Sequence, residues 1–255
     1  MKLLFLGDVV GASGVDFVKN NLWRIKREHN IDITVINGEN SAQGNGITPE
    51  SFDDLIHAGA DVITTGNHCF RRREMLPLYE QKDVLLRPAN YPEGVVGRGV
   101  VTVDLGRAQV AVVNLMGTVY LDALDNPFYA MDRLLPEIDT PNIIVDFHAE
   151  ATAEKKSMGF YLAGKVTAVL GTHTHVQTAD DTVLEGGTAY ITDVGMTGPE
   201  VSVLGVKKEL AIEKLRSRCP VAFKESDSPC FMNAVIVTFN ERNGRAEAIE
   251  RLMIR

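Results

Sequence analysis

Apolar and polar positions follow two periods along the chain, and the change from one period to the other marks the expected elements. Runs of strand length that are rich in apolar residues lie at 2–7, 33–38 and 62–66. Between them, apolar residues recur every three to four positions at 15–29 and again after Thr48, a residue able to cap a helix. The first part of the chain therefore predicts strands that alternate with helices.

The pattern changes after a helix that we expect at about 71–81. The next apolar runs predict consecutive strands with Gly-rich turns, at 84–89, 99–105 and 109–115. Because these strands are not separated by helices, the predicted sheet is mixed. The following segment, 116–130, combines Gly, Asp, Asn and aromatic residues and is interpreted as a loop.

The rest of the chain predicts two more strand-and-helix units and then a return to strands. Gly186-Gly187 and Asn243-Gly244 are typical hairpin turns. The expected strands lie at 143–147, 166–170, 183–185, 188–192, 234–239 and 246–254, with helices at about 151–163 and 207–217. We predict one domain over residues 1–255 of the α/β class, a layered α/β/β/α sandwich of two mixed sheets with helices outside.

Composition and charge exclude several classes of protein. The 255 residues are 45% hydrophobic and 24% charged, as in globular domains, and the net charge of −8 argues against a broad basic face for duplex nucleic acid or anionic membrane. No run approaches the ~18 apolar residues of a membrane span. Cys69, Cys219 and Cys230 form no CxxC pair, so we expect free thiols. A cytoplasmic protein without a membrane partner is the resulting expectation.

Side chains able to bind metal ions follow five of the predicted strands. They are Asp8, Glu39 with Asn40, Asn67 with His68, His148, and His173 with His175. Ligands bind outside the carboxyl ends of strands in open α/β sheets, so these points can converge on one site. The set is too large for one tetrahedral metal and suits two metal ions that share a carboxylate. Imidazole with oxygen ligands favours Fe, Mn or Zn over Ca.

The order of these residues resembles the motifs of the calcineurin-like metallophosphoesterase superfamily. The resemblance is carried by Asp8, by Gly66-Asn67-His68, by His148 and by the run from Gly171 to His175. That superfamily's first motif usually reads Asp-x-His, whereas this chain has Asp8-Val9-Val10. Its second motif usually reads Gly-Asp, whereas this chain has Gly38-Glu39-Asn40. Both departures resemble the YmdB-like branch of bacterial phosphodiesterases, which is similar to essentially the whole chain.

The resemblance implies two divalent or trivalent metal ions per chain, Fe and/or Mn, with Zn as an alternative. The implied ligands of the first metal are Asp8, Glu39, Asn40 and His175. Those of the second are Glu39, Asn67, His148 and His173, so that Glu39 bridges. His68 is left free as the general acid, and a metal-bridging hydroxide would be the nucleophile.

The implied function is that of a dinuclear-metal-dependent phosphoesterase, a phosphodiesterase that acts on small or cyclic nucleotides. The residues themselves do not choose between a diester and a monoester, so a phosphatase activity stays open as an alternative. RNA is kept as a larger alternative substrate, and we expect a homo-oligomer because compact enzymes of this kind often form symmetric ones. The run Arg71-Arg72-Arg73 would be able to contact a substrate phosphate, although a charge run that opens a helix is more often a solvated face.

Three other functions remain open at this point. Gly7, Gly11 and Gly14 with Glu39 partly match a dinucleotide-binding oxidoreductase, but the glycine spacing differs and the histidines would have no role. A metal-dependent amidohydrolase would place its HxH early in the chain rather than at 173–175. A non-catalytic or regulatory protein that binds metal, nucleotide or RNA would not need His68.

Overall fold

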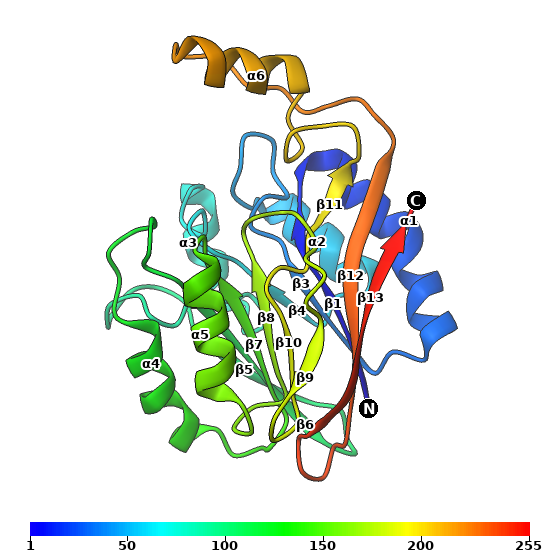
Figure 1. Cartoon of the computed structure of the whole chain (residues 1–255), viewed down its shortest axis with the longest axis vertical. Coiled ribbons are helices and arrows are strands. Elements are labelled where there is room, and N and C mark those ends of the chain that lie inside the picture. The colour runs from blue at the N-terminus through cyan, green and yellow to red at the C-terminus, as the bar shows by residue number, and fades with distance from the viewer.

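Two β-sheets, each with helices on its outer face, make up the computed structural model of this chain, which describes residues 1–255 (Figure 1). The first sheet has the order β2 (Asp8–Val9), β11 (Met196–Pro199), β12 (Cys230–Phe239), β1 (Lys2–Leu6), β3 (Ile33–Asn37) and β4 (Val62–Thr64), with β13 (Ala246–Ile254) paired to β12. The second has the order β5 (Val100–Asp104), β6 (Gln109–Met116), β7 (Ile143–His148), β8 (Ala168–Thr172), β10 (Thr188–Ile191) and β9 (Thr182–Leu184).

Both sheets contain parallel and antiparallel pairs. In the first, β1 pairs in parallel with β3 and antiparallel with β12. In the second, β6, β7 and β8 run in parallel, whereas β5 and β9 are antiparallel edge strands. The predicted α/β/β/α sandwich of two mixed sheets is therefore confirmed, and the assignment of one domain to residues 1–255 stays a prediction.

Alternation along β1 explains why the sheet has two buried faces. Leu3 and Phe5 belong to the cluster between the two sheets, together with Val112 and Ile144 of the second sheet. Their neighbours Leu4 and Leu6 point the other way because successive side chains of a strand face opposite sides. An uninterrupted apolar run is therefore the expected sequence of such a strand.

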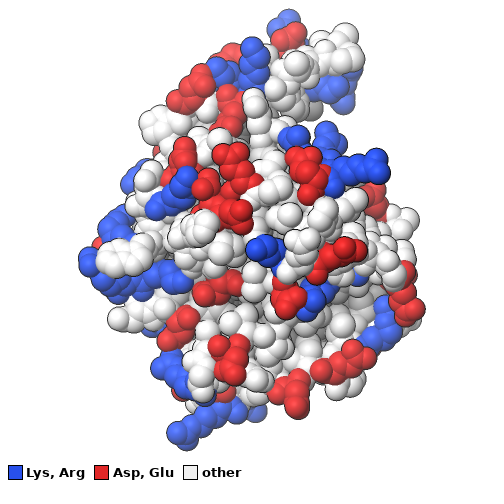
Figure 2. All heavy atoms as spheres, turned by 180° about the vertical axis from the view of Figure 1, so that it is seen from behind, with Lys and Arg blue, Asp and Glu red and all other residues white.

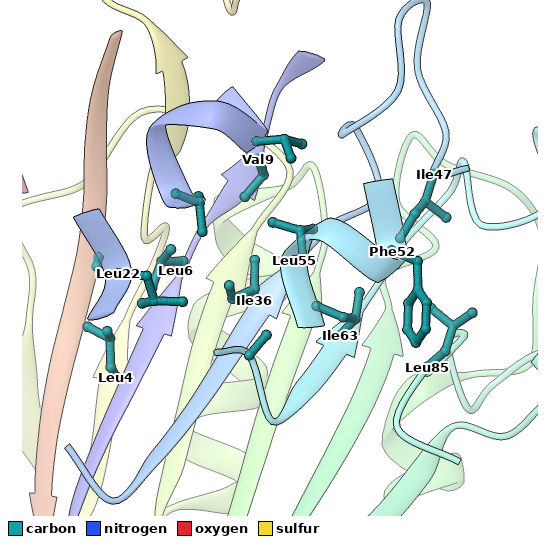
Figure 3. Close-up of a cluster of buried hydrophobic side chains, with 14 of the residues drawn as sticks. Leu4, Leu6, Val9, Leu22, Ile36, Ile47, Phe52, Leu55, Ile63 and Leu85 are labelled. Carbon is teal, nitrogen blue, oxygen red and sulfur yellow. The ribbon is translucent and has the colours of Figure 1, made fainter. Parts of the chain in front are cut away.

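The helices cover the outer faces. In α1 (Gly11–His29) and α2 (Pro49–Ala58), Leu22, Phe52 and Leu55 pack on the first sheet. Figure 3 shows these side chains in one cluster with side chains of the sheet, among them Leu6 and Ile36. The second sheet is covered by α4 (Pro127–Leu134) and α5 (Thr152–Leu162). The short α3 (Leu76–Gln81) follows a 3-10 turn, Arg73–Met75, and another such turn, Leu135–Glu137, follows α4. The last helix, α6 (Lys208–Ser217), projects beyond the sheets (Figure 1).

Most predicted elements are confirmed, including the helix capped by Thr48, whose hydroxyl accepts a hydrogen bond from the main-chain N–H of Ser51. Both hairpins also form, between β9 and β10 and between β12 and β13. The strand expected at 84–89 is wrong: Leu85 and Leu86 form only isolated bridges. Pro88 lacks the N–H group that a continuing ladder would need.

Two further differences come from signals at helix starts. The segment 116–130 is not a loop throughout, because α4 begins at Pro127, with the Asn126 side chain accepting hydrogen bonds from the first helical N–H groups. The first helix begins at Gly11 rather than near Val15, since its first turn is small and polar and carries no apolar period. Both are errors of boundary, and the layer order is unaffected.

The surface agrees with the mixed charge of the sequence. On the face opposite to that of Figure 1, acidic and basic side chains are interspersed and no continuous basic area is visible (Figure 2). None of the helices combines the length and the apolar character needed to cross a membrane.

Candidate metal centre

The residues that follow the strands meet at one edge of the two sheets. Asp8 lies in β2 directly after β1, and Glu39 follows β3. From the second sheet, His148 is the last residue of β7 and His173 follows β8. Contacts of 3.5 Å or less connect all eight residues singled out in the sequence, which are Asp8, Glu39, Asn40, Asn67, His68, His148, His173 and His175.

One part of the cluster is formed by Asp8, Asn40 and His175. The Asn40 amide donates to Asp8 Oδ1 at 3.2 Å, and His175 Nε2 lies 3.5 Å from the same oxygen and 3.3 Å from Asn40 Nδ2. The main-chain N–H of His173 donates to the other oxygen, Asp8 Oδ2, at 2.9 Å. Asp8 and Asn40 therefore connect the first sheet to the loop that follows β8.

The other part surrounds Nε2 of His148. This nitrogen lies 3.1 Å from Glu39 Oε1, 3.0 Å from Asn67 Oδ1 and 3.0 Å from His173 Nδ1. Gly66 permits the approach, because a Cβ at that position would lie 2.1 Å from the imidazole ring of His148. Four atoms that carry lone pairs thus crowd around one point, and Glu39 touches both parts of the cluster through its contact with Asn40.

The opposite nitrogen of His148 is held by a buried chain of hydrogen bonds. Nδ1 lies 2.9 Å from Thr172 Oγ1, and the Thr172 hydroxyl lies 2.7 Å from Asp146 Oδ1. Since the hydroxyl has one proton and donates it to the carboxylate, Nδ1 is the protonated nitrogen of the ring. In the neutral ring, Nε2 then directs its lone pair at the cluster, the orientation that a metal ligand needs.

Asp146 joins the two sheets through this chain. It is fully buried, and Asn37 of β3 and Thr64 of β4 also donate to its carboxylate. Burial raises the pKa of Asp146 to about 6, against the opposing effects of His148 and of the hydrogen bonds.

A second buried group holds the loop that carries His173 and His175. Both histidines have positive φ angles, 96° and 63°, which L residues rarely adopt. Between them, Thr174 donates through N at 3.0 Å and through Oγ1 at 2.7 Å to Asp193 Oδ2. The same oxygen accepts from Lys155 Nζ at 2.8 Å, and both members of this ion pair are buried. The loop is thus fixed in a strained conformation by a charge pair beneath it.

The pKa directions show that the cluster stabilises positive charge at His148. Burial lowers the pKa of His148, but the carboxylates of Glu39, Asp8 and Asp146 outweigh it and raise the value to about 9. Burial alone would raise the pKa of Asp8, but the effects of His175 and His148 are together larger and lower the pKa to about 2. The pKa of Glu39 is likewise well below its ordinary value, because His148 and His68 overcome the effect of burial. A cation at this point would satisfy the same carboxylates.

The residues fit bound metal ions. Glu39, His148 and His173 each offer one ligand atom, and these atoms lie within 4.8 Å of one another. In addition, Asn40 Oδ1 and His175 Nδ1 are buried without a hydrogen-bond partner, a costly state for polar atoms. Carboxylate oxygen with imidazole nitrogen is a donor set suited to Zn, Fe or Mn.

His68 differs from the other imidazoles. Its side chain is 24% exposed, whereas those of His148, His173 and His175 are 0%, 18% and 11% exposed. Nδ1 of His68 lies 3.2 Å from Glu39 Oε1, and its main-chain N–H donates to Glu39 Oε2 at 3.0 Å. Glu39 therefore orients the His68 ring through Nδ1. The other ring nitrogen, Nε2, lies on the opposite side of the ring, 3.2 Å from Asn67 Nδ2.

Four supporting residues were missed by the sequence analysis: Glu150, Asp146, Lys155 and Asp193. Glu150 Oε2 lies 3.0 Å from His173 Nε2, on the side of the ring away from His148. Asp146 had a signal, since a charge inside the apolar run before His148 must find partners when buried. Lys155 and Asp193 had none, because they meet only in the folded chain.

Comparisons with known proteins show the family to which the chain belongs. The family model described as YmdB-like protein matches residues 4–252. A Bacillus subtilis protein named 2',3'-cyclic-nucleotide 2'-phosphodiesterase is 44% identical over 256 residues, which cover 100% of this chain and 97% of that protein. The crystal structure of a phosphatase from Mycoplasma pneumoniae superposes with a TM-score of 0.94 at 34% identity, covering 100% of this chain and 93% of the other.

A more distant structure shows the fold alone. A calcineurin-like phosphoesterase of Bacillus subtilis superposes with a TM-score of 0.53 at 11% identity, over 100% of this chain and 90% of the other. The two mixed sheets are thus those of the calcineurin-like phosphoesterases, as the order of the motifs predicted. With a family model over nearly the whole chain, the protein is a phosphoesterase and belongs to the YmdB-like family.

Proposed function

We propose that this phosphoesterase is a phosphodiesterase that uses two metal ions to hydrolyse small cyclic nucleotides, with 2',3'-cyclic nucleotides as the substrate class. The convergence of two carboxylates, two amides and three imidazoles on one edge of the sheets carries the proposal, because such a set suits two metals rather than one. The name of the 44% identical Bacillus subtilis relative supports the choice of substrate.

The ligands divide along the two parts of the cluster. Asp8, Asn40 and His175 would hold one metal and Asn67, His148 and His173 the other, with Glu39 shared between them. The shared role of Glu39 is supported by its contacts with Asn40 on one side and with His148 on the other. Fe and Mn are the metals that we expect.

The metal ions, when bound, would neutralise the phosphate charge and provide a water molecule of lowered pKa as the nucleophile. The chain's own contribution is His68. Its Nδ1–H donates to Glu39, which fixes the ring, and a proton on Nε2 would pass to the oxygen that leaves phosphorus, the ribose 2'-oxygen for this substrate class. Its exposure, the largest among the four imidazoles, suits a group that must reach the substrate.

The test combines metal replacement with a matched pair of histidine variants. Protein stripped of metal and refilled with Mn or Fe is assayed on 2',3'-cyclic AMP, bis(p-nitrophenyl) phosphate and p-nitrophenyl phosphate. We expect metal-restored turnover of the diesters over the monoester. His68→Ala should keep the full metal content and lose about 10²–10⁴-fold in kcat. His57→Ala, an exposed histidine in the last turn of α2, is the control.

Two outcomes would contradict the proposal. Wild-type protein that holds two metals but hydrolyses none of the three substrates would favour a binding or regulatory protein. Unchanged turnover in His68→Ala would refute the role of His68 as general acid, but it would not contradict the phosphoesterase activity itself.

A further inference from the structure

A cavity of about 330 Å³ lies beside the metal cluster, with Asn40 in its wall. Its other walls include Arg71 from the segment after His68, Leu204 and Val206 from the chain before α6, and Phe223 and Lys224 from the chain after α6. The volume is at the lower end of the ~300–1,000 Å³ typical of small-molecule sites, so it suits one small ligand. None of these residues except Asn40 has a role in the ligand cluster.

The wall formed by Leu204, Val206 and Phe223 is apolar and open. Leu204 is 47% exposed and Phe223 is 54% exposed, and Phe223 has no aromatic partner in the protein. An exposed phenyl ring that lines a cavity offers a flat apolar face, which is the partner that a nucleobase stacks on.

The segments that carry this wall are held in place. Before and after α6 the chain forms a paired arm, in which Lys207 N donates to Lys224 O and Ser226 N donates to Gly205 O, both at 2.9 Å. The arm leads to the projecting helix α6 in Figure 1. Glu225 accepts a hydrogen bond from the main-chain N–H of Ser13 in α1. The cavity is therefore a built feature rather than a gap beside a loose loop.

The arm also approaches the metal cluster closely. Gly205 has a φ of 93°, and a Cβ there would lie 2.4 Å from Cγ1 of Val10, which is two residues after Asp8. Glycine at position 205 thus lets the arm lie against the segment that carries Asp8. The cavity and the cluster are continuous through Val10 and Asn40, both of which line the cavity.

The charge in the cavity wall favours an anion, because Arg71 and Lys224 outnumber the one carboxylate there, Glu225, which accepts a hydrogen bond from Ser13. Arg71 and Lys224 are exposed there and take part in none of the ion pairs of the protein, whose net charge is −8. Two free cations beside the carboxylate-rich cluster would draw an anionic ligand toward it. Apolar surface and positive charge side by side suit a ligand that has a flat base and a negative charge, as a nucleotide does.

We propose that this cavity binds the nucleoside part of the substrate, with the base stacked on Phe223 and with Arg71 and Lys224 attracting the nucleotide, while the cyclic phosphate lies at the cluster beyond Asn40. Phe223 is then a specificity-determining residue outside the metal ligands. The proposal rests on the cyclic-nucleotide phosphodiesterase function given above and adds where the base is recognised.

The test compares two substrates that differ only in the base: 2',3'-cyclic AMP and methyl riboside 2',3'-cyclic phosphate, which has a methoxy group in place of adenine. We expect Phe223→Ala to lower the ratio of their kcat/KM values by about 5- to 100-fold, the range of base stacking, mainly through KM for cyclic AMP. Phe223→Tyr should restore most of the ratio. Phe160→Ala, which removes a 66% exposed phenyl ring on α5, should leave the ratio as in the wild type.

The positive charge is tested separately. Arg71→Ala should raise KM for both cyclic phosphates several-fold at low ionic strength, with a smaller difference at high salt because screening weakens the attraction in the wild type. Metal content is measured in every variant and should equal that of the wild type, so that a loss of metal is not mistaken for a loss of substrate contact.

Failure of this proposal can be told from failure of the proposed function. If the wild type hydrolyses neither cyclic phosphate, the function itself is wrong. If it hydrolyses both and Phe223→Ala leaves the ratio of kcat/KM values unchanged, the phosphodiesterase stands and the base is recognised elsewhere.

Discussion

The two halves of the metal cluster are built differently. The half from the first sheet consists of carboxylates and amides, Asp8, Glu39, Asn40 and Asn67, which contact the opposite half directly. The half from the second sheet consists of imidazoles, and each of these depends on further polar groups. Thr172 contacts Nδ1 of His148 and donates a hydrogen bond to Asp146. The loop that carries His173 and His175 is held by the buried pair of Asp193 and Lys155.

The difference follows from the side chains. The short side chains of Asp, Glu and Asn follow closely after the ends of their strands, so the position of the strand largely determines where their oxygen atoms lie. An imidazole must also present the correct nitrogen, and a hydrogen bond to the other nitrogen decides which one carries the proton. The second sheet supplies this support to His148 through Thr172 and Asp146. For His173 and His175 the buried pair of Asp193 and Lys155 instead holds the loop that carries both rings.

The largest effect should come from the ligands themselves, in either half. Asp8→Asn keeps the shape but removes the charge on which His175 and the main chain of His173 depend. We expect metal content to fall and activity to drop by more than about 100-fold, beyond the 10- to 100-fold typical of residues that only support a ligand. His173→Ala should do the same from the other half. Elemental analysis showing full metal in both variants would refute the ligand assignment.

The next effect distinguishes the halves. Lys155→Met leaves the carboxylate of Asp193 buried without its partner, which should cost about 3–5 kcal/mol of folding free energy. Because Asp193 also holds Thr174, metal affinity should fall as well. Denaturant unfolding and equilibrium metal binding measure the two effects, and the double variant Lys155→Met/Asp193→Asn should regain much of the stability. If Lys155→Met alone is as stable as the wild type, the ion pair of Lys155 and Asp193 does not support the imidazoles of the second sheet.

The same contrast explains what the sequence could predict. The ligands were found because each follows an apolar run, and parallel strands bring their carboxyl ends to one edge. The supports were not found because burial, rather than position after a strand, gives them their role. Lys155 lies in a helix and meets Asp193 from 38 positions away, and no periodicity marks either of them.

The fold was predictable to a similar degree. Runs rich in apolar residues predicted β1, β3 and β7 because these strands are buried on both faces, even though Asp146 lies within β7. The run at 84–89 also begins with three apolar residues, yet it pairs with β4 through one isolated bridge, and a turn begins at Pro88. A short apolar run indicates burial, and whether it also pairs depends on its neighbours in space.

A smaller effect should come from the chain of hydrogen bonds behind His148. Thr172→Val keeps the shape and removes the hydroxyl between Nδ1 and Asp146. We expect about 10- to 100-fold weaker metal binding, measured by calorimetry. Thr172→Ser retains the hydroxyl and should bind as the wild type does. If the valine variant binds metal normally, the tautomer of His148 is set by something other than Thr172.

The smallest effect concerns Asp180, a carboxylate between β8 and β9 of the second sheet that contacts none of the proposed metal ligands. It accepts hydrogen bonds from Thr178 and Thr192, which outweigh the effect of burial and lower its pKa from 3.8 to about 2. A carboxylate with a lowered pKa stabilises the fold at any pH above its ordinary pKa. This contribution to stability is lost as the pH falls from about 4 to about 2. Because the side chain is partly exposed, screening limits the contribution to under about 1 kcal/mol.

Asp180→Asn should therefore flatten the acid limb of the stability curve slightly and leave metal affinity unchanged, as measured by thermal unfolding between pH 2 and pH 5 and by metal titration at neutral pH. That result would restrict the supporting role in the second half to the carboxylates placed directly beneath the imidazoles, Asp146 and Asp193. Weakened metal binding in Asp180→Asn would instead mean that the whole hydrogen-bonded layer of the second sheet, rather than two buried charges, orients the ligands.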